Sequence, residues 1–286
     1  MPSFEGNAAP AVAESAPVVL DNGAEPGSDE VRSHAFQPGL PGTLAAAGVP
    51  LAATAVYFIF GEPLWAILAL GGLNVIGFAL PGLRPVFAFA RTVLAFLALT
   101  FAINTFGIAY PYSNIFVLTG LLGMFSLSGR EWKSLYFGAG ATRRFGKPAL
   151  VLAAATAILI LTVYFQRPEL LGNNPTPRAW PADVIVLMAI GYALFSALME
   201  ETIFRSLFMA YARQSLGVGI AIAAQALIFA MMHYRVGFPM QAAGGVLALI
   251  WALAAGWLVK KADSVYPAYL MHFIVVLSLF LVLAFA

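Results

Sequence analysis

Long apolar stretches recur along the whole chain, and short polar segments separate them. A helix needs roughly 20 apolar residues to cross a bilayer, and several of these stretches reach or approach that length. The pattern predicts an all-α fold, a polytopic transmembrane helical bundle of about eight to nine helices. The predicted spans are residues 43–60, 64–80, 86–109, 113–128, 148–165, 183–213, 217–238, 240–260 and 265–286.

Composition agrees with a membrane protein. Hydrophobic residues make up 61% of the chain and charged residues only 10%, whereas about a quarter of an ordinary soluble domain is charged. The absence of cysteine excludes disulfides, thiolate nucleophiles and Cys-ligated metal centres. The formal net charge of +2 is too small to indicate nucleic-acid binding, so the expected surroundings are the lipid bilayer and no nucleic acid.

The chain divides into three predicted regions. Residues 1–42 are rich in Pro, Gly, Ala and Ser and carry mostly acidic charges, which predicts a disordered acidic N-terminal tail. Residues 43–178 hold the N-terminal transmembrane helices. Residues 179–286 hold the remaining helices, together with the ionisable side chains that are candidates for chemistry.

Basic residues in the loops predict the orientation of the chain in the membrane. Loops on the side of the N-terminus hold Arg84, Arg130, Lys133, Arg143, Arg144, Lys147, Arg213, Lys260 and Lys261, and the opposite loops hold Arg167, Arg178 and Arg235. The positive-inside rule then places the N-terminus in the cytoplasm and the C-terminus outside. The Ala-rich composition without organellar targeting is typical of a multi-pass protein of the bacterial inner membrane.

One predicted span carries small residues at every fourth position, namely Gly244, Ala248, Ala252 and Gly256. Such a ridge lets another helix approach closely. We interpret it as helix packing within the bundle and not as a specialised dimer face.

Few ionisable side chains lie inside the predicted spans, and each of them costs about 2.5 to 3.5 kcal/mol at a helix centre. Arg91, in the third span, is interpreted as an interfacial or packing residue. The others are concentrated near the C-terminus. They are Glu200, Glu201, Arg205, His233 and His272.

The two adjacent glutamates are predicted to differ in role. Adjacent residues on an α-helix point about 100° apart. Glu201 and Arg205 are four positions apart with the acid first, which is the favoured order for an ion pair. Glu201 is therefore predicted to pair with Arg205, which leaves Glu200 free as a general base that takes a proton from water.

The two histidines are predicted to lie near Glu200. At about 1.5 Å rise per residue, Glu200 and His233 lie at similar distances from a tight turn predicted near Leu216 and Gly217. A neutral imidazole there can hold a water molecule, shuttle a proton or bind a metal. No cofactor is required by the sequence; if a divalent metal such as Zn²⁺ is present, its ligands would be Glu200, His233 and His272.

These residues match known motifs. Glu200 to Arg205 reads EExxxR, Phe229 to His233 reads FxxxH, and His272 follows in a later span. Together they resemble the CPBP intramembrane protease family, also called the Abi family, which includes the type II CAAX prenyl endopeptidases. The resemblance implies a CPBP-like catalytic transmembrane core at residues 179–286.

The resemblance also implies roles. The first glutamate and the FxxxH histidine, here Glu200 and His233, activate the water that attacks the peptide bond, with Glu201 and Arg205 beside them. The third-motif histidine, here His272, stabilises the oxyanion together with an Asn four residues later, where this chain has Val276.

Gln225 and Asn104 are candidates for the missing amide group. For Gln225, however, a hydrogen bond to a neighbouring helix is the favoured interpretation.

The expected function is an intramembrane endopeptidase acting on a membrane-associated protein or peptide. Two alternatives stay open. One is a catalytically silent CPBP-type scaffold or a bacteriocin self-immunity protein, which the missing Asn favours. The other is a proton-coupled transporter, which any set of ionisable residues inside a membrane allows.

Overall fold

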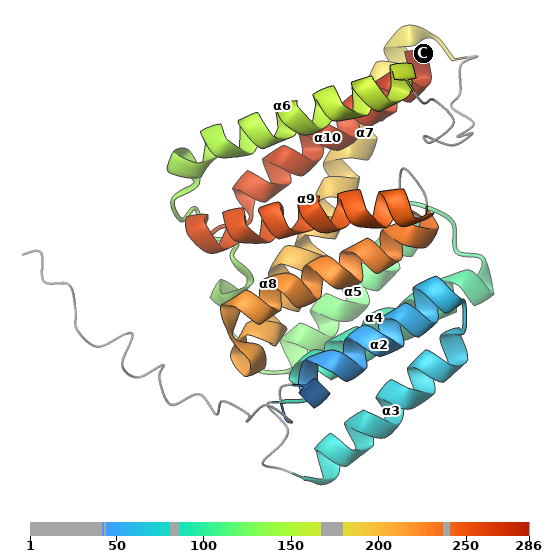
Figure 1. Ribbon diagram of the computed structural model, residues 1–286, viewed down its shortest axis with the longest axis vertical. Helices are drawn as coiled ribbons and strands as arrows, with labels where there is room; N and C mark the ends of the chain where they lie inside the picture. Colours follow the sequence, from blue (N-terminus) through green and yellow to red (C-terminus); the bar gives the residue numbers. More distant parts are fainter. Residues whose placement is uncertain (1–41, 43, 81–85, 167–179, 237–240, 286) are drawn as a thin grey trace, which may run out of the picture. The chain divides into compact units, whose positions relative to one another are not determined.

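The computed structural model describes residues 42, 44–80, 86–166, 180–236 and 241–285 of the chain (Figure 1). The predicted acidic tail, residues 1–42, lies outside the described residues except for position 42. Every extended regular element in the described part of the chain is a helix, and no strand occurs there. The predicted all-α class is confirmed.

The helix bounds follow the predicted spans closely. The first part of the described chain forms η1 (Leu44–Gly48), α2 (Val49–Ala55), η2 (Val56–Phe60), α3 (Pro63–Ala79), α4 (Ala88–Phe106), α5 (Tyr112–Leu127) and η4 (Trp132–Leu135). The second part forms α6 (Thr142–Gln166), α7 (Ala182–Glu200), η6 (Glu201–Phe208), α8 (Met209–Val236), α9 (Gln241–Ala262) and α10 (Tyr266–Phe285).

Helices in the described residues are long and apolar enough to cross a membrane in five places. They are Ala88–Phe106, Thr142–Gln166, the continuous run Ala182–Arg235, Gln241–Ala262 and Tyr266–Phe285. Three shorter apolar helices accompany them, at Ala45–Phe60, Pro63–Ala79 and Tyr112–Leu127. The chain is an integral multi-pass membrane protein, as predicted.

The run from Ala182 to Arg235 is broken at Gly217. This residue has φ 76° and ψ 165°, a conformation that is essentially restricted to glycine. The break confirms the turn predicted near Leu216 and Gly217. It allows α8 to pack against η6, the preceding part of the same run.

A π-helical segment, η6, begins at the second glutamate. The sequence predicts one α-helix through this region, but residues Glu201–Phe208 form a π-helix, and all eight are buried. Because a π-helix is wider than an α-helix, the register of the side chains changes where α7 ends. Such segments are rare and are found frequently at functional sites.

The helices of the C-terminal region surround η6. α8 packs along α9, and α10 packs against both α6 and α7 (Figure 1). On the other side α4 packs against α3, α5 and α8. The η6 segment also contacts α5, α9 and α10, so its side chains meet those of several helices that are distant in sequence.

The ridge of small residues on α9 forms a contact with α8. All four residues are buried, and the carbonyl oxygen of Ala252 accepts a hydrogen bond from Gln225 Nε2 of α8 at 3.0 Å. A Cβ atom added to Gly256 would lie 2.9 Å from the same Gln225 nitrogen. The interpretation of this ridge as a packing surface is confirmed.

Candidate active site

The two glutamates lie where α7 meets η6. Glu200 is the last residue of α7 and Glu201 is the first of η6, so the wider π turn follows the pair directly. Their burial differs: the Glu201 side chain is 2% exposed, and that of Glu200 is 21% exposed. The two adjacent carboxylates therefore have different surroundings, and the predicted difference in their roles stays a prediction.

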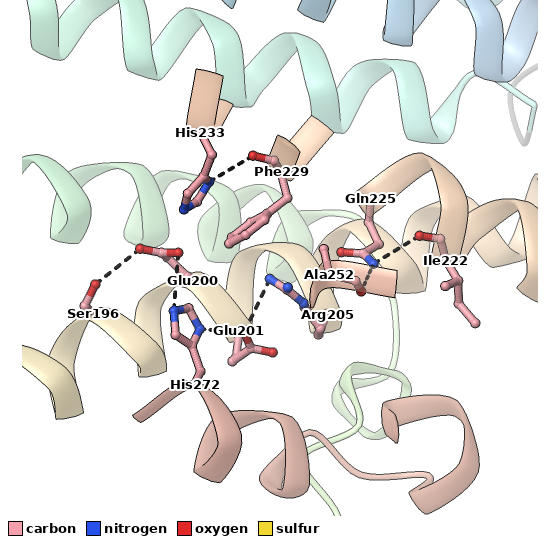
Figure 2. A network of polar contacts seen from close by, with 10 residues as sticks. All are labelled: Ser196, Glu200, Glu201, Arg205, Ile222, Gln225, Phe229, His233, Ala252 and His272. Carbon is pink, nitrogen blue, oxygen red and sulfur yellow. Dashed lines mark hydrogen bonds and ion pairs between the residues drawn. The ribbon is translucent and has the colours of Figure 1, made fainter. Parts of the chain in front are cut away.

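Glu201 connects an arginine and a histidine. Its Oε1 atom lies 3.3 Å from Arg205 Nη1 and 2.7 Å from His272 Nδ1, as Figure 2 shows. The ion pair with Arg205 is the one that the spacing predicts. The bond to His272 could not be read from the spacing, because it joins η6 to a helix 71 positions later in the chain.

Arg205 is completely buried, with a side-chain exposure of 0%. Its guanidinium carbon lies 4.4 Å from the ring centroid of Phe229 and 4.7 Å from that of Trp251. The charge is therefore stabilised by one carboxylate and two aromatic faces, which attract a cation strongly when water is excluded. This arrangement orients Glu201, and Glu201 in turn holds His272.

Glu200 makes different contacts from its neighbour. Its Oε1 atom accepts a hydrogen bond from Ser196 Oγ, one turn earlier, at 3.2 Å. Its Oε2 atom lies 3.7 Å from His272 Nε2 and accepts no hydrogen bond within the described part of the chain. One carboxylate oxygen of Glu200 is thus oriented by the protein, and the other is buried without a hydrogen-bond partner among the described residues.

His233 approaches Glu200 from α8. Its Nδ1 atom lies 2.9 Å from the carbonyl oxygen of Phe229, and its ring lies against the Phe229 ring, tilted by 32°, with centroids 4.0 Å apart. Glu200, His272 and Arg205 all lie close enough for their charges to interact with the His233 imidazole. In Figure 2 the Glu200 carboxylate lies between the imidazole rings of His233 and His272.

Tyr110, in the connection between α4 and α5, lies close enough to Glu200 for the charge of the carboxylate to affect it. Its ring centroid is 5.2 Å from that of Tyr192. Burial raises the pKa of Tyr110 to about 12, and the charges of Tyr192 and Glu200 act in the same direction. The phenol is therefore protonated at neutral pH and can donate a hydrogen bond.

An apolar groove leads to the two histidines. It has a volume of about 260 Å³ and is lined by residues of α6, α8, α9 and α10. His233, His272 and Trp251 are among its lining residues, whereas neither glutamate is. An extended apolar chain in this groove would therefore contact the imidazoles.

The proposed metal ligands do not fit a metal centre. Among the described residues no three His, Asp or Glu side chains are arranged to hold a metal ion. Nδ1 of His272 is bonded to Glu201, and Nδ1 of His233 faces the Phe229 carbonyl. Arg205 adds a positive charge beside this group, so no catalytic step is assigned here to a metal.

The two substitutes considered for the missing Asn lie elsewhere. Gln225 Nε2 donates to the carbonyl oxygens of Ile222 and Ala252, which confirms the interhelical hydrogen bond favoured for it. Asn104 hydrogen-bonds Tyr57. Val276 lines the apolar groove with His272.

Ser196 and Trp251 also belong to this site, and neither was predicted from the sequence. Ser196 could have been recognised, because it lies four residues before Glu200 and so on the same helix face. Trp251 stacks with Phe229 and lies 4.6 Å from the His272 ring between centroids. No local pattern indicates this role for Trp251, since its partners lie on other helices.

Comparison with known proteins assigns the C-terminal region. Residues 182–278 match the family model described as type II CAAX prenyl endopeptidase Rce1-like. No curated protein and no solved structure matches the chain. The matched segment begins at the first residue of α7 and contains the EExxxR motif, the FxxxH motif and His272. Residues 182–278 are therefore similar to the type II CAAX prenyl endopeptidase Rce1-like family, and this match supports the assignment of that region to the CPBP/CAAX protease family.

Proposed function

We propose that the chain is an intramembrane endopeptidase that hydrolyses a peptide bond of a membrane-associated protein or peptide. The observation that carries this proposal is the position of the Glu200 carboxylate, close to two imidazoles at an apolar groove. Such a groove suits a lipid-embedded peptide segment, and the carboxylate and imidazoles can activate water. The similarity of residues 182–278 to the Rce1-like family supports this chemistry.

In the proposed reaction Glu200 and His233 act on one water molecule. Glu200 Oε2 takes a proton from the water as its oxygen attacks the carbonyl carbon, and His233 holds the same water in position. When the carbon–nitrogen bond breaks, the proton passes from Glu200 to the leaving amine. Ser196 fixes the carboxylate through its other oxygen.

His272 is proposed to stabilise the oxyanion. Glu201 accepts a hydrogen bond from Nδ1, and this contact orients the ring. In the protonated form of His272, Nε2 can then donate a hydrogen bond to the negative oxygen of the tetrahedral intermediate. In this scheme Glu201 and Arg205 are positioning residues that act through His272.

Val276 in place of an amide favours one other function. A domain with only one oxyanion donor is expected to be slower by about 100-fold to 1000-fold, and a catalytically silent scaffold or self-immunity protein would tolerate the change. Val276 faces the groove beside His272. The experiment described next, which compares peptide processing in variants of Glu200 and His233, decides between the peptidase and the silent scaffold or self-immunity protein.

The decisive experiment compares membrane peptides in cells that express the wild-type chain, Glu200→Gln, His233→Ala or Glu131→Gln at equal levels. Glu131 is an exposed control carboxylate whose partner is Lys133. Mass spectrometry of the membrane fraction should show uncleaved peptides accumulating in the first two variants only, because general-base catalysis contributes about 100-fold or more. Normal processing in both variants would mean that the peptidase proposal is wrong.

The proposal also includes the membrane in which the chain lies and the side on which its N-terminus lies. We place the chain in a bacterial inner membrane with its N-terminus in the cytoplasm, on the basis of its basic loops and its composition. The partners are then the bilayer and a membrane-associated peptide or protein.

A further inference from the structure

A second cavity lies between the first turn of α4, the end of α5 and the part of α8 that precedes Gly217. Its volume is about 320 Å³, and its lining residues are Ala88, Arg91, Met124, Ser128, Arg130 and Tyr211. Two of these six residues are arginines, and none of the six is acidic. None of the five proposed catalytic and positioning residues lines it, so this cavity is distinct from the candidate active site.

Arg130 is held in place but keeps hydrogen-bonding capacity. Its guanidinium carbon lies 4.0 Å above the Tyr211 ring, and its buried Nη1 atom has no hydrogen-bond partner among the described residues. Burial lowers the pKa of Arg130, Tyr211 opposes this shift, and the positive charge of Arg91 lowers the pKa further. An anion between the two arginines would relieve their repulsion and satisfy the buried nitrogen.

Hydroxyl groups complete one wall of the cavity. The Tyr211 hydroxyl donates to Ser128 Oγ at 3.4 Å, and Ser128 Oγ donates to the Phe125 carbonyl at 2.6 Å. The bond from Tyr211 is long, so its proton can turn to an anion at small cost. Two guanidinium groups and a hydroxyl donor form the kind of set that binds phosphate.

The cavity is placed at the edge of the apolar spans. Arg91 lies in the first turn of α4, and Ser128 directly follows the last residue of α5. Lys133, Arg143 and Arg144 follow in the same part of the chain, on the side that the positive-inside rule assigns to the cytoplasm. Lipid headgroups and their phosphates occupy this level of a bilayer.

We propose that this arginine cavity binds a phosphate group, with Arg91 and Arg130 as the cationic ligands and Tyr211 as a hydroxyl donor. The phosphate can belong to a phospholipid headgroup or to a free phosphate compound in the cytoplasm. The cavity then anchors the α4–α5 end of the bundle to an anion. This proposal does not depend on peptidase activity.

The test measures binding to the purified full chain in a non-phosphate detergent. The probes are dihexanoyl phosphatidylglycerol and inorganic phosphate, with sodium chloride at equal ionic strength as a blank, and the readouts are native mass spectrometry and thermal stabilisation. We expect saturable binding that Arg130→Gln weakens by about 10-fold or more. Arg143→Gln, a change at an exposed arginine outside the cavity, should leave binding unchanged.

The probes separate the two sources of phosphate. Saturable binding of the phospholipid alone assigns the headgroup, and saturable binding of inorganic phosphate assigns a free phosphate compound. If neither probe binds saturably, or if Arg130→Gln binds the probe like the wild type, the proposal is overturned.

A second measurement uses the wild-type chain and so does not depend on the folding of a variant. Phenylglyoxal modifies accessible arginines, and the modified residues are identified by mass spectrometry. The bound phosphate probe should slow modification of Arg91 and Arg130 by several-fold and leave Arg143 unaffected. Equal rates at all three arginines with and without the probe would overturn the proposal.

Discussion

Arg205 shows how a charge is kept inside this bundle. A buried cation is tolerated when opposite charge and polarisable groups replace the water that it has lost. Glu201 supplies the charge at 3.3 Å, and the rings of Phe229 and Trp251 supply the aromatic faces. Removing one charged member of this group leaves the other charge buried without a partner. The effects of mutations in the group on stability are therefore expected to be non-additive.

A double-mutant cycle tests this coupling. Arg205→Met should lower the free energy of unfolding by about 3–5 kcal/mol, because the Glu201 carboxylate is left buried with His272 only. The double variant Glu201→Gln/Arg205→Met should cost less than the sum of the two single changes. Denaturant unfolding in detergent, followed by tryptophan fluorescence, provides the measurement.

The control for this cycle is Arg144→Met, a change at an exposed arginine, with an expected effect within about 0.5 kcal/mol. Strict additivity of the Glu201 and Arg205 changes would contradict the proposed coupling.

At the scale of the element, η6 and the ridge on α9 shape the site. Both depend on close approach between helices: the side chains of η6 are all buried, and α9 brings small residues against α8. The ridge lets Gln225 reach the Ala252 carbonyl, and it places Trp251 against Phe229. A larger side chain on the ridge should therefore disturb both the packing and the site.

Gly256→Val tests the ridge directly. The added Cβ would lie 2.9 Å from Gln225 Nε2 and 3.0 Å from a methyl carbon of Ile222, so we expect a loss of about 1–3 kcal/mol in stability. Gly191→Val, on α7, is the matched control, because nothing lies within 4 Å of its added Cβ. The measurement is the thermal unfolding temperature of the two variants, compared side by side. Equal decreases in this temperature would argue against a packing role for the ridge.

These elements also show what sequence can predict. The helical spans and the Glu201–Arg205 pair follow from local spacing, and both are found in the structure. The π-helical form of η6 was not predicted, because the wider turn depends on burial against several helices. The bond between Glu201 and His272 and the position of Trp251 were not predicted for the same reason, since they require α9 and α10 to be in place.

At the scale of the whole molecule, the basic residues in the loops between the helices predict a single orientation of the chain in the membrane. The connection between α4 and α5 should face the outside, and the segment that follows α5 should face the cytoplasm. The chain contains no cysteine, so a single introduced cysteine reports only its own position.

Cysteine labelling tests this orientation. In intact cells a membrane-impermeant maleimide should label Tyr112→Cys, at the exposed start of α5. Lys133→Cys and Lys261→Cys, which replace exposed lysines in the predicted cytoplasmic loops, should be labelled only after the membrane is permeabilised. The opposite pattern would reverse the orientation and would move the arginine cavity to the outer face.

The pairing of Arg205 with Glu201 also bears on how the protein is made. Both residues lie in the same continuous helical run, so we expect the cation to enter the membrane during synthesis already accompanied by its counterion. The insertion machinery then handles a neutral pair and not two separate charges, each of which would cost about 2.5–3.5 kcal/mol at a helix centre. The segment can thus leave the translocon before α9 and α10 have been synthesised. His272 and Trp251 then join a pair that is already in the lipid.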